Sequence, residues 1–334
     1  MEILKLAISG WFSRALAVAA RLGIADELAG GALSAGELAR RTGTDPDVLH
    51  RLLQMLTVPG VLERDEQGAF RLTEAYDALR ADHPFTQRHF AILAAEFYDD
   101  AFAGLEHTVR TGESGFRHVF GSSLYEHLAV NPELEALFDQ GMVDLARPVA
   151  AALAQQHDFT GVGTVVDVGG GSGGLLPGLL SAHPHLRGVV ADRAGVCDRG
   201  PDALSAISAP DVVQRISFQP SDFFAEVPAG GDRYVLKNVL HDWNYDNCVR
   251  ILRVVRDAMV RDEPDGHPHL LVLEPLVEAD IDGWRAIFQA LACDEGTLGL
   301  DEEDLRRALT EAGFEVCAVD RMVTGHKLVD CVPA

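Results

Sequence analysis

A glycine-rich turn that directly follows an apolar segment is the first place where this sequence could do chemistry. The segment Thr164–Val168 is rich in β-branched residues, contains Asp167, and leads through the letters GGGSGG into a helical pattern. A strand, a glycine turn and a helix in this order let the backbone approach a nucleotide-like ligand closely, because glycine has no side chain at the contact. A second apolar segment, Gly188–Ala191, ends in Asp192, and an acid at such a position commonly binds a ribose diol.

Polar residues recur at the ends of further strand-like segments. These segments are Thr164–Val168, Gly188–Ala191, Ile216–Gln219, Tyr234–Val239, His269–Leu273, Glu315–Val319 and His326–Cys331. Helical patterns separate the first five, and this alternation predicts a doubly wound α/β sheet. Ligands of such sheets bind at the carboxyl ends of the strands. One crevice should therefore collect Asp167 and the glycines, Asp192, Ser221, Asp222, Phe223, the 237–241 region and Glu274.

The N-terminal region has a different pattern, and 334 residues are enough for two domains. Ser34 and Glu37 form a capping-box sequence, and Pro46 suits the first turn of the next helix, Pro46–Leu56. The apolar side of that helix should hold Val48, Leu49, Leu52, Leu53 and Leu56. The segments Val61–Arg64 and Ala69–Leu72 then predict a hairpin, which completes a winged-helix pattern.

A winged helix raises the hypothesis of a DNA-binding regulator. Its second helix would have to present basic residues to phosphates, but this one offers Arg51 and little else. The formal net charge of −23 also argues against a nucleic-acid partner and against an anionic membrane surface. We therefore expect residues 1–105 to form a helical dimerisation domain, and residues 106–334 to form the α/β domain.

Residues from about 82 to 156 stay helical in pattern and contain recurrent aromatic residues and Met142. Such residues commonly pack in a core, but as a group they could equally line an apolar pocket. We expect the helical part, residues 106–156, to line a pocket for a small molecule, with Met142 contributing to it.

Compartment signals favour the cytoplasm. The five cysteines show no CxxC spacing and are expected to be free thiols, at Cys197, Cys248, Cys293, Cys317 and Cys331. The first stretch is apolar but carries Glu2, Lys5, Arg14 and Arg21 at helical intervals, which favours an amphipathic helix over a signal peptide. No stretch has the length and composition expected of a membrane span.

The segment Tyr234–Trp243, with the letters YVLKNVLHDW, resembles a known family. Together with DVGGGSGG, SDFF, TGESGF (Thr111–Phe116) and EAGF (Glu311–Phe314), it resembles the S-adenosylmethionine-dependent O-methyltransferases of the plant caffeate type and their actinobacterial natural-product relatives. The resemblance covers essentially the whole chain. It implies a Rossmann-like class I methyltransferase domain whose seven-stranded sheet has a reversed last strand. It also implies a homodimer formed through the N-terminal domain.

The cofactor site that the resemblance implies, for S-adenosylmethionine, consists of Asp167, Gly169, Gly171, Asp192, Ser221, Asp222, Phe223 and Lys237. By this resemblance the two glycines pass under the methionine part of the cofactor, and Asp192 accepts the ribose hydroxyls. Asp222 and Phe223 hold the adenine, and Lys237 lies beside the ribose and the carboxylate end.

By the same resemblance, His241 matches the family's catalytic base and Glu274 matches the acid that orients it. These residue types suit methyl transfer, because the methyl donor is already electrophilic and the protein has only to align an oxygen with it and remove a proton. A histidine can accept a phenol proton, and a carboxylate on its other ring nitrogen fixes the tautomer. The implied reaction is O-methylation of an aromatic or polyketide-like molecule in secondary metabolism, with Asp242 and Phe288 lining the pocket beside Met142.

The sequence departs from the family before the penultimate helix. Relatives usually carry GG(K/R)ERT there, whereas this chain reads CDEGTLGLDEEDL. Alignment of the helix starts puts Gly299 in place of the family's glutamate, and Glu295 is nearby but displaced. Trp284 and Phe288 also stand in a segment that lacks the family's Asp-Met pattern. These changes leave open a second function, in which the same fold binds the cofactor but catalyses hydroxylation, decarboxylation, a pericyclic reaction, or C- or N-methylation.

A dehydrogenase and a metalloenzyme are less favoured interpretations of the same residues. The glycine turn overlaps the fingerprint of NAD-dependent dehydrogenases, in which LHDW and SDFF would have no role. A metal site could combine His241 and Asp242 with a distant histidine, His267, His269 or His326. However, adjacent ligands at one helix start point in different directions. We expect no metal.

Overall fold

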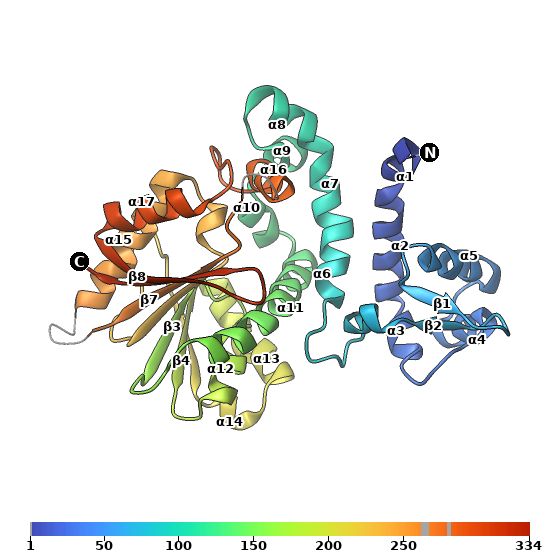
Figure 1. The fold of residues 1–334 in the computed structure, drawn as a ribbon, viewed down its shortest axis with the longest axis horizontal. Coiled ribbons are helices and arrows are strands. Elements are labelled where there is room, and N and C mark those ends of the chain that lie inside the picture. The colour runs from blue at the N-terminus through green and yellow to red at the C-terminus, as the bar shows by residue number, and fades with distance from the viewer. Residues whose placement is uncertain (1, 262–266, 279–281) are drawn as a thin grey trace. The chain divides into compact units, whose positions relative to one another are not determined.

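The computed structural model describes residues 2–261, 267–278 and 282–334 (Figure 1). The chain forms two compact units: Met1–Phe102 with Pro132–Leu145, and Ala103–Asn131 with Ala146–Ala334. Helix α11 (Pro132–Gln156) passes from the first unit into the second. The sequence pattern predicts a single boundary after residue 105. In the structure, the later segment Pro132–Leu145 also belongs to the first unit.

The first unit contains the predicted helices and the hairpin. Its elements are α1 (Glu2–Ala7), α2 (Ser9–Arg21), α3 (Ile24–Glu27), α4 (Ala35–Thr42), α5 (Pro46–Thr57), β1 (Leu62–Arg64), β2 (Phe70–Leu72), η1 (Glu74–Leu79), α6 (Arg88–Leu93), η2 (Ala94–Tyr98) and α7 (Asp99–Ala101). Strands β1 and β2 pair antiparallel, with Leu62 opposite Leu72. The winged-helix prediction is therefore confirmed by the order α4, α5 and hairpin.

Two details of the helix prediction differ from the structure. The Ser34 hydroxyl accepts a hydrogen bond from the Glu37 N–H, but the Glu37 side chain pairs with Arg40 and Arg41. The capping box is thus only half formed, because two guanidinium groups compete for that carboxylate. Val48 is 69% exposed and does not belong to the apolar side of α5, since it lies in the first turn after the Asp45 cap.

The run Glu2–Arg21 combines helical length with apolar composition. Among the residues that the structure describes, it is the one helical run that could cross a membrane by these two criteria. A core helix or a signal sequence near the N-terminus meets the same criteria. Helix α1 buries none of its residues, and Ile3, Leu4 and Leu6 are exposed.

The second unit is built on a seven-stranded sheet with the order β5-β4-β3-β6-β7-β9-β8. The strands are β3 (Thr164–Val168), β4 (Arg187–Asp192), β5 (Ile216–Pro220), β6 (Arg233–Lys237), β7 (His269–Glu274), β8 (Phe314–Arg321) and β9 (Lys327–Pro333). The pairs from β5 through to β7 are parallel, and β9 runs antiparallel to both β7 and β8. The predicted doubly wound sheet with a reversed last strand is confirmed.

Helices cover both faces of this sheet (Figure 1). They are α12 (Leu176–Ala182), α13 (Ala194–Ile207), α14 (Pro210–Val213), α15 (Tyr245–Arg261) and α17 (Glu302–Ala312). Alternate strand residues enter two separate cores, as the period of two requires. Val166 and Leu236 pack towards α15 and α17, whereas Val165, Val235 and Leu271 pack towards α11 and α12.

One predicted helix is missing. Between β5 and β6 the chain forms a turn without a helix, although the pattern predicts helices between all of the first five strands. Pro228 and two glycines interrupt the segment, and a side chain at Gly231 would come within 2.6 Å of Val166. The connection therefore lies directly on β3, with no room for a helix.

The short helix η3 (Phe102–Gly104) spans the boundary between the two units. The remaining elements of the second unit are α8 (Leu105–Thr111), α9 (Gly115–Phe120), α10 (Leu124–Ala129), η4 (Leu240–Asp242) and α16 (Gly283–Ala292). A side chain at Gly104 would come within 2.3 Å of the Gly115 carbonyl oxygen. Gly115 of the TGESGF segment thus lies in close backbone contact with Gly104, which leaves no room for a side chain.

Candidate active site

The turn after β3 forms one end of the candidate site. Gly169 and Gly171 have φ angles of 70° and 58°, which favour glycine. The Gly171 N–H donates to Asp192 Oδ2 at 2.9 Å, and a side chain at Gly169 would come within 2.9 Å of Val239. The structure therefore brings together the glycines and the Asp192 carboxylate that the sequence singled out.

Asp167 lies beneath this turn and is buried. Its Oδ2 has no hydrogen-bond partner among the described residues, and a side chain at Gly170 would come within 2.6 Å of it. Burial raises the pKa of Asp167 to about 7, although the Lys237 ammonium acts in the opposite direction. A buried carboxylate oxygen without a partner fits a ligand that carries a positive charge or an N–H donor, as the amino group of S-adenosylmethionine does.

An aromatic wall adjoins the glycine turn. The Ser221 N–H donates to the Asp192 carbonyl at 2.8 Å, which places Ser221, Asp222 and Phe223 beside the end of β4. The Phe223 ring lies 5.8 Å from the Trp243 ring, edge to face, and 3.5 Å from where a Gly169 side chain would begin. Asp222 Oδ1 accepts a hydrogen bond from the Phe224 N–H. Trp243 belongs to the LHDW motif, and that motif is the one feature of the sequence that pointed to it. Its part in this aromatic wall is seen only in the structure.

The second end of the site is η4, where one carboxylate holds three groups. Glu274 is completely buried at the end of β7. Its Oε1 accepts hydrogen bonds from the N–H groups of Val239 and Leu240, both at 2.8 Å. Its Oε2 lies 2.6 Å from His241 Nδ1. The two residues that the sequence paired are thus in direct contact.

The other ring nitrogen of His241 faces a second carboxylate. Nε2 lies 3.4 Å from Asp242 Oδ1. Burial lowers the pKa of His241, but the charges of Glu274 and Asp242 outweigh it and raise the pKa to about 9. Burial likewise lowers the pKa of Lys237, against the opposing effect of Asp167, Glu274 and Asp242. Two basic and three acidic side chains therefore form one coupled group.

Asp242 is itself held by residues that the sequence did not single out for the site. The Tyr125 hydroxyl donates to Asp242 Oδ2 at 2.6 Å, and the Cys293 thiol donates to Oδ1 at 3.2 Å. Burial raises the pKa of the Cys293 thiol well above its usual value. Tyr125 lies in an ordinary helical pattern on α10 and Cys293 is an isolated cysteine. No local signal in the sequence could have indicated either contact.

The structure also shows the surroundings of Gly299 and Glu295, where the sequence departs from the family pattern. Gly299 has a φ of 100°, and a side chain there would come within 3.1 Å of Ala286 and Val277. The Glu295 side chain is exposed, and its carbonyl accepts a hydrogen bond from Asn244 Nδ2. The second carboxylate beside His241 is therefore Asp242.

The predicted pocket residues are distributed over both units. Asp242 lies in the site described above, and Phe288 is half-buried on α16 of the same unit. Met142 lies on the part of α11 that belongs to the first unit.

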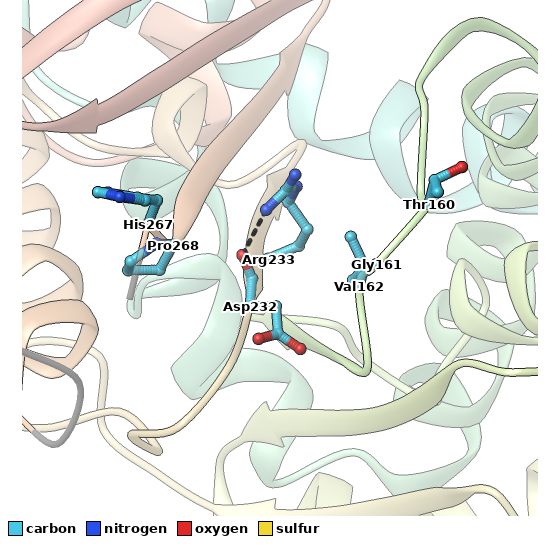
Figure 2. Close-up of a pocket in the computed structure, with 7 residues that line it drawn as sticks. All are labelled: Thr160, Gly161, Val162, Asp232, Arg233, His267 and Pro268. Carbon is cyan, nitrogen blue, oxygen red and sulfur yellow. Dashed lines mark hydrogen bonds between the residues drawn. The ribbon is translucent and has the colours of Figure 1, made fainter. Parts of the chain in front are cut away.

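A small pocket lies at the opposite ends of the strands. Figure 2 shows its lining, which encloses a volume of about 230 Å³ and consists of Thr160, Gly161, Val162, Asp232, Arg233, His267 and Pro268. These residues precede or begin β3, β6 and β7, so they lie at the amino ends of the strands. The Arg233 guanidinium donates to the Asp232 carbonyl at 2.8 Å (Figure 2). This pocket is therefore separate from the glycine turn and η4.

The histidines considered as distant metal ligands have different partners. His269 Nδ1 lies 2.6 Å from Asp330, and His326 Nε2 lies 2.9 Å from Asn238 Oδ1. Within the described ranges, no three histidine, cysteine, aspartate or glutamate side chains are grouped so that they could hold a metal ion.

Comparison with known proteins identifies related domains over most of the chain. An O-methyltransferase domain model matches residues 102–315, and an O-methyltransferase dimerisation domain model matches residues 4–81. O-demethylpuromycin-O-methyltransferase from Streptomyces alboniger is 36% identical over 96% of this chain and 86% of its own length. Aclacinomycin 10-hydroxylase from Streptomyces purpurascens is 37% identical over 80% of this chain and 70% of its own length.

A solved structure extends the comparison to ligands. The O-methyltransferase from neocarzinostatin biosynthesis, in complex with S-adenosylmethionine and 2-hydroxy-5-methyl naphthoic acid, is 32% identical. It superimposes with a TM-score of 0.75 and covers 96% of each chain. The chain described here therefore belongs to the S-adenosylmethionine-dependent O-methyltransferase family of the bacterial natural-product type.

Proposed function

We propose that this enzyme methylates a hydroxyl group of an aromatic or polyketide-like small molecule, with His241 as the general base. The observation that carries the proposal is the 2.6 Å contact between His241 and the fully buried Glu274, at the carboxyl ends of β6 and β7. The related enzyme with a bound hydroxynaphthoic acid supports the aromatic class of acceptor.

The residues around the glycine turn suit the cofactor. We assign Gly169 and Gly171 to the methionine part, Asp192 to the ribose hydroxyls, and Asp222 and Phe223 to the adenine. When bound, S-adenosylmethionine supplies a methyl group on a positively charged sulfur. The partnerless oxygen of Asp167 is placed to accept a hydrogen bond from its amino group. We assign Ser221 and Lys237 to the same site, where Lys237 lies among three carboxylates.

His241 has the surroundings of a base. Glu274 occupies Nδ1, so Nε2 is the nitrogen that can accept the proton from the acceptor hydroxyl. The negative charge of Glu274 then stabilises the imidazolium that forms and holds the ring in one orientation. The acceptor oxygen, freed of its proton, is the nucleophile that gains the methyl group. Asp242 lies beside Nε2 and is placed to accept a hydrogen bond from a second polar group of the acceptor.

Mass spectrometry with S-adenosylmethionine that carries a deuterated methyl group tests this proposal. A panel of hydroxylated aromatic and polyketide acceptors is incubated with the wild-type enzyme and with His241→Ala. Labelled product matched by S-adenosylhomocysteine release, with at least a roughly 100-fold lower rate for His241→Ala at unchanged cofactor binding, is the expected result. Equal rates for the two enzymes would overturn the assignment of the base.

A second function is favoured by two points: the resemblance places Gly299 where relatives usually carry a glutamate, and one relative is a hydroxylase. In this second function the cofactor stays bound and the acceptor undergoes non-methylating chemistry. An acceptor that changes mass without the label, and without release of S-adenosylhomocysteine, would support it. Stoichiometric release of S-adenosylhomocysteine would exclude it.

We also propose that the enzyme is a homodimer through its N-terminal unit. The dimerisation domain model matches residues 4–81, and the start of the chain exposes Ile3, Leu4, Leu6 and Trp11. Exposed apolar side chains at such density usually mark an interface.

A further inference from the structure

The backbone at Asn238, between the cofactor-side Lys237 and the catalytic η4, has an unusual conformation. Asn238 has a φ of 55° and is the one non-glycine residue with a positive φ in the described part of the chain. Left-handed backbone costs energy for residues that carry a Cβ, although asparagine tolerates it better than most. Such a conformation persists where the surrounding structure holds it, and it often marks a functional site.

The turn at Asn238 determines which groups the Glu274 carboxylate can bind. Strand β6 pairs with β7 up to Lys237, and the Asn238 N–H still donates to the Leu273 carbonyl at 3.0 Å. The next two N–H groups, of Val239 and Leu240, then both point at Glu274 Oε1. A change of direction at Asn238 is what allows one carboxylate to bind two successive N–H groups and His241.

The side chain of Asn238 is held from a different part of the chain. Its Oδ1 lies 2.9 Å from Nε2 of His326, the residue immediately before β9. The ring is fixed on its other side, because Nδ1 lies 3.1 Å from the Thr324 hydroxyl. The hairpin turn closes through the Met322 N–H, which donates to the His326 carbonyl at 2.8 Å.

The reversed last strand explains why this histidine can reach the site. Because β9 runs antiparallel to β7, with Lys327 opposite Glu274, the β8–β9 turn lies at the carboxyl end of β7. Burial and the nearby Lys237 ammonium lower the pKa of His326 to about 4, so the ring is neutral near pH 7. A neutral ring that accepts from Thr324 at Nδ1 carries its proton on Nε2 and donates it to Asn238.

We propose that His326 is a positioning residue: its hydrogen bond to Asn238 holds the left-handed turn that sets Val239, Leu240 and His241 against Glu274. The inference rests on the proposed role of His241 as the base. It gives the antiparallel hairpin a part in the catalytic geometry, in addition to its part in the sheet.

A double-mutant cycle tests this inference. The proteins are the wild-type enzyme, His326→Ala, Asn238→Gly and the double variant, and their methyl-transfer rates are compared on one acceptor. We expect His326→Ala to lower kcat by about tenfold or more, because small displacements of a catalytic group are costly. In the Asn238→Gly background, where the partner oxygen is gone and glycine adopts the φ without strain, the same substitution should have less than about a threefold effect. Equal factors in both backgrounds would overturn the proposal.

Two further readouts separate positioning from loss of folding. His326→Gln retains an N–H donor and should restore most of the rate, whereas a merely space-filling role would be equally well served by His326→Leu. In His326→Ala the acid limb of the pH–rate profile should move to lower pH, because His241 loses part of its contact with Glu274. Asp242 and Lys237, which also face His241, are unchanged. An unmoved limb would count against the proposal.

Val323→Ala is the matched control, since Val323 lies in the same turn and is 86% exposed. It should leave the rate unchanged. If His241→Ala fails to lower the rate, the proposed base is wrong. If His241→Ala lowers it and His326→Ala does not, only the positioning role of His326 fails.

Discussion

At the scale of single residues, the central feature is a histidine between two carboxylates. Glu274 and Asp242 raise the pKa of His241 to about 9 against the effect of burial. In its proposed role as a base, His241 acts only in its neutral form, so the fraction of competent enzyme should increase as the pH rises towards this value. The resting enzyme at pH 7 thus holds mainly an imidazolium.

The value of kcat/KM should therefore rise through the neutral range, bend near pH 9 and level off only above that pH. Glu274→Gln removes the charge that favours the imidazolium, so the rising limb should move to lower pH. The maximal rate should fall by about 100-fold or more, because the ring also loses its orientation. Rate measurements from about pH 6 to about pH 10 check both effects. If the rising limb lies at the same pH in the wild-type enzyme and in Glu274→Gln, a group other than His241 controls it.

Asp167 differs from His241, because burial dominates and disfavours its charged form. In the proposed role, this cost to the fold is offset when the ligand binds. Its pKa is raised to about 7, above the ordinary value of 3.8, so the folded state binds this proton more tightly than the unfolded chain. The proton on Asp167 therefore stabilises the folded state at low pH, and this stabilisation is lost as the pH rises through about 7. At pH 8 the buried charge destabilises the ligand-free protein.

Asp167→Asn should accordingly raise the Tm of the ligand-free enzyme at pH 8 by a few degrees, and should have little effect at pH 4. The same substitution should weaken S-adenosylmethionine binding by about tenfold or more, because a charge-assisted hydrogen bond is lost. Thermal melts and calorimetric titration measure the two effects. A variant that is destabilised at pH 8 would contradict this account of the carboxylate.

At the scale of elements, most of the α/β pattern was predictable and the exceptions have local causes. The strands follow from short apolar segments, and Asp192 and Glu274 follow from their positions at strand ends. The expected helix between β5 and β6 is absent because Pro228 and Gly231 place that segment directly against β3. Tyr125 and Cys293 could not be predicted, because their contacts with Asp242 join segments far apart in the chain.

A close contact between η3 and α9 gives a prediction for the TGESGF region. In Gly104→Ala the new methyl group would meet the Gly115 carbonyl oxygen at 2.3 Å, so η3 and α9 would have to separate. We expect a loss of about 2 kcal/mol or more in the free energy of unfolding. Gly36→Ala, in α4, is the matched control, since nothing lies within 4 Å of the added carbon. It should stabilise by about 0.5–1 kcal/mol. Urea titrations measure both, and a neutral Gly104→Ala would contradict the contact.

At the scale of the whole molecule, composition bears more on the classes of partner that are disfavoured than on the molecule that is bound. The net charge of −23, and the near absence of basic residues beside Arg51 in the second helix of the winged-helix segment, disfavour nucleic acid. Selection of an acceptor depends on the side chains of a whole pocket surface, to which we propose that Phe288 contributes. Residue patterns along one chain do not encode such a surface, so the acceptor class comes from chemistry and from relatives.

Assembly is the last property that belongs to this scale. A helix in a folded domain normally buries its apolar stripe, yet α1 buries none of its residues, and Leu4 and Trp11 are 64% and 65% exposed. The wild-type chain should therefore have the mass of a dimer in light scattering, and Leu4→Glu/Trp11→Glu should shift it to a monomer, because charges buried at an interface are costly. Val323→Glu, at an exposed apolar site of the other unit, should remain dimeric. A dimer that persists in the double variant would place the interface elsewhere, and a monomeric wild-type chain that binds lipid vesicles would assign this helix to a membrane surface instead.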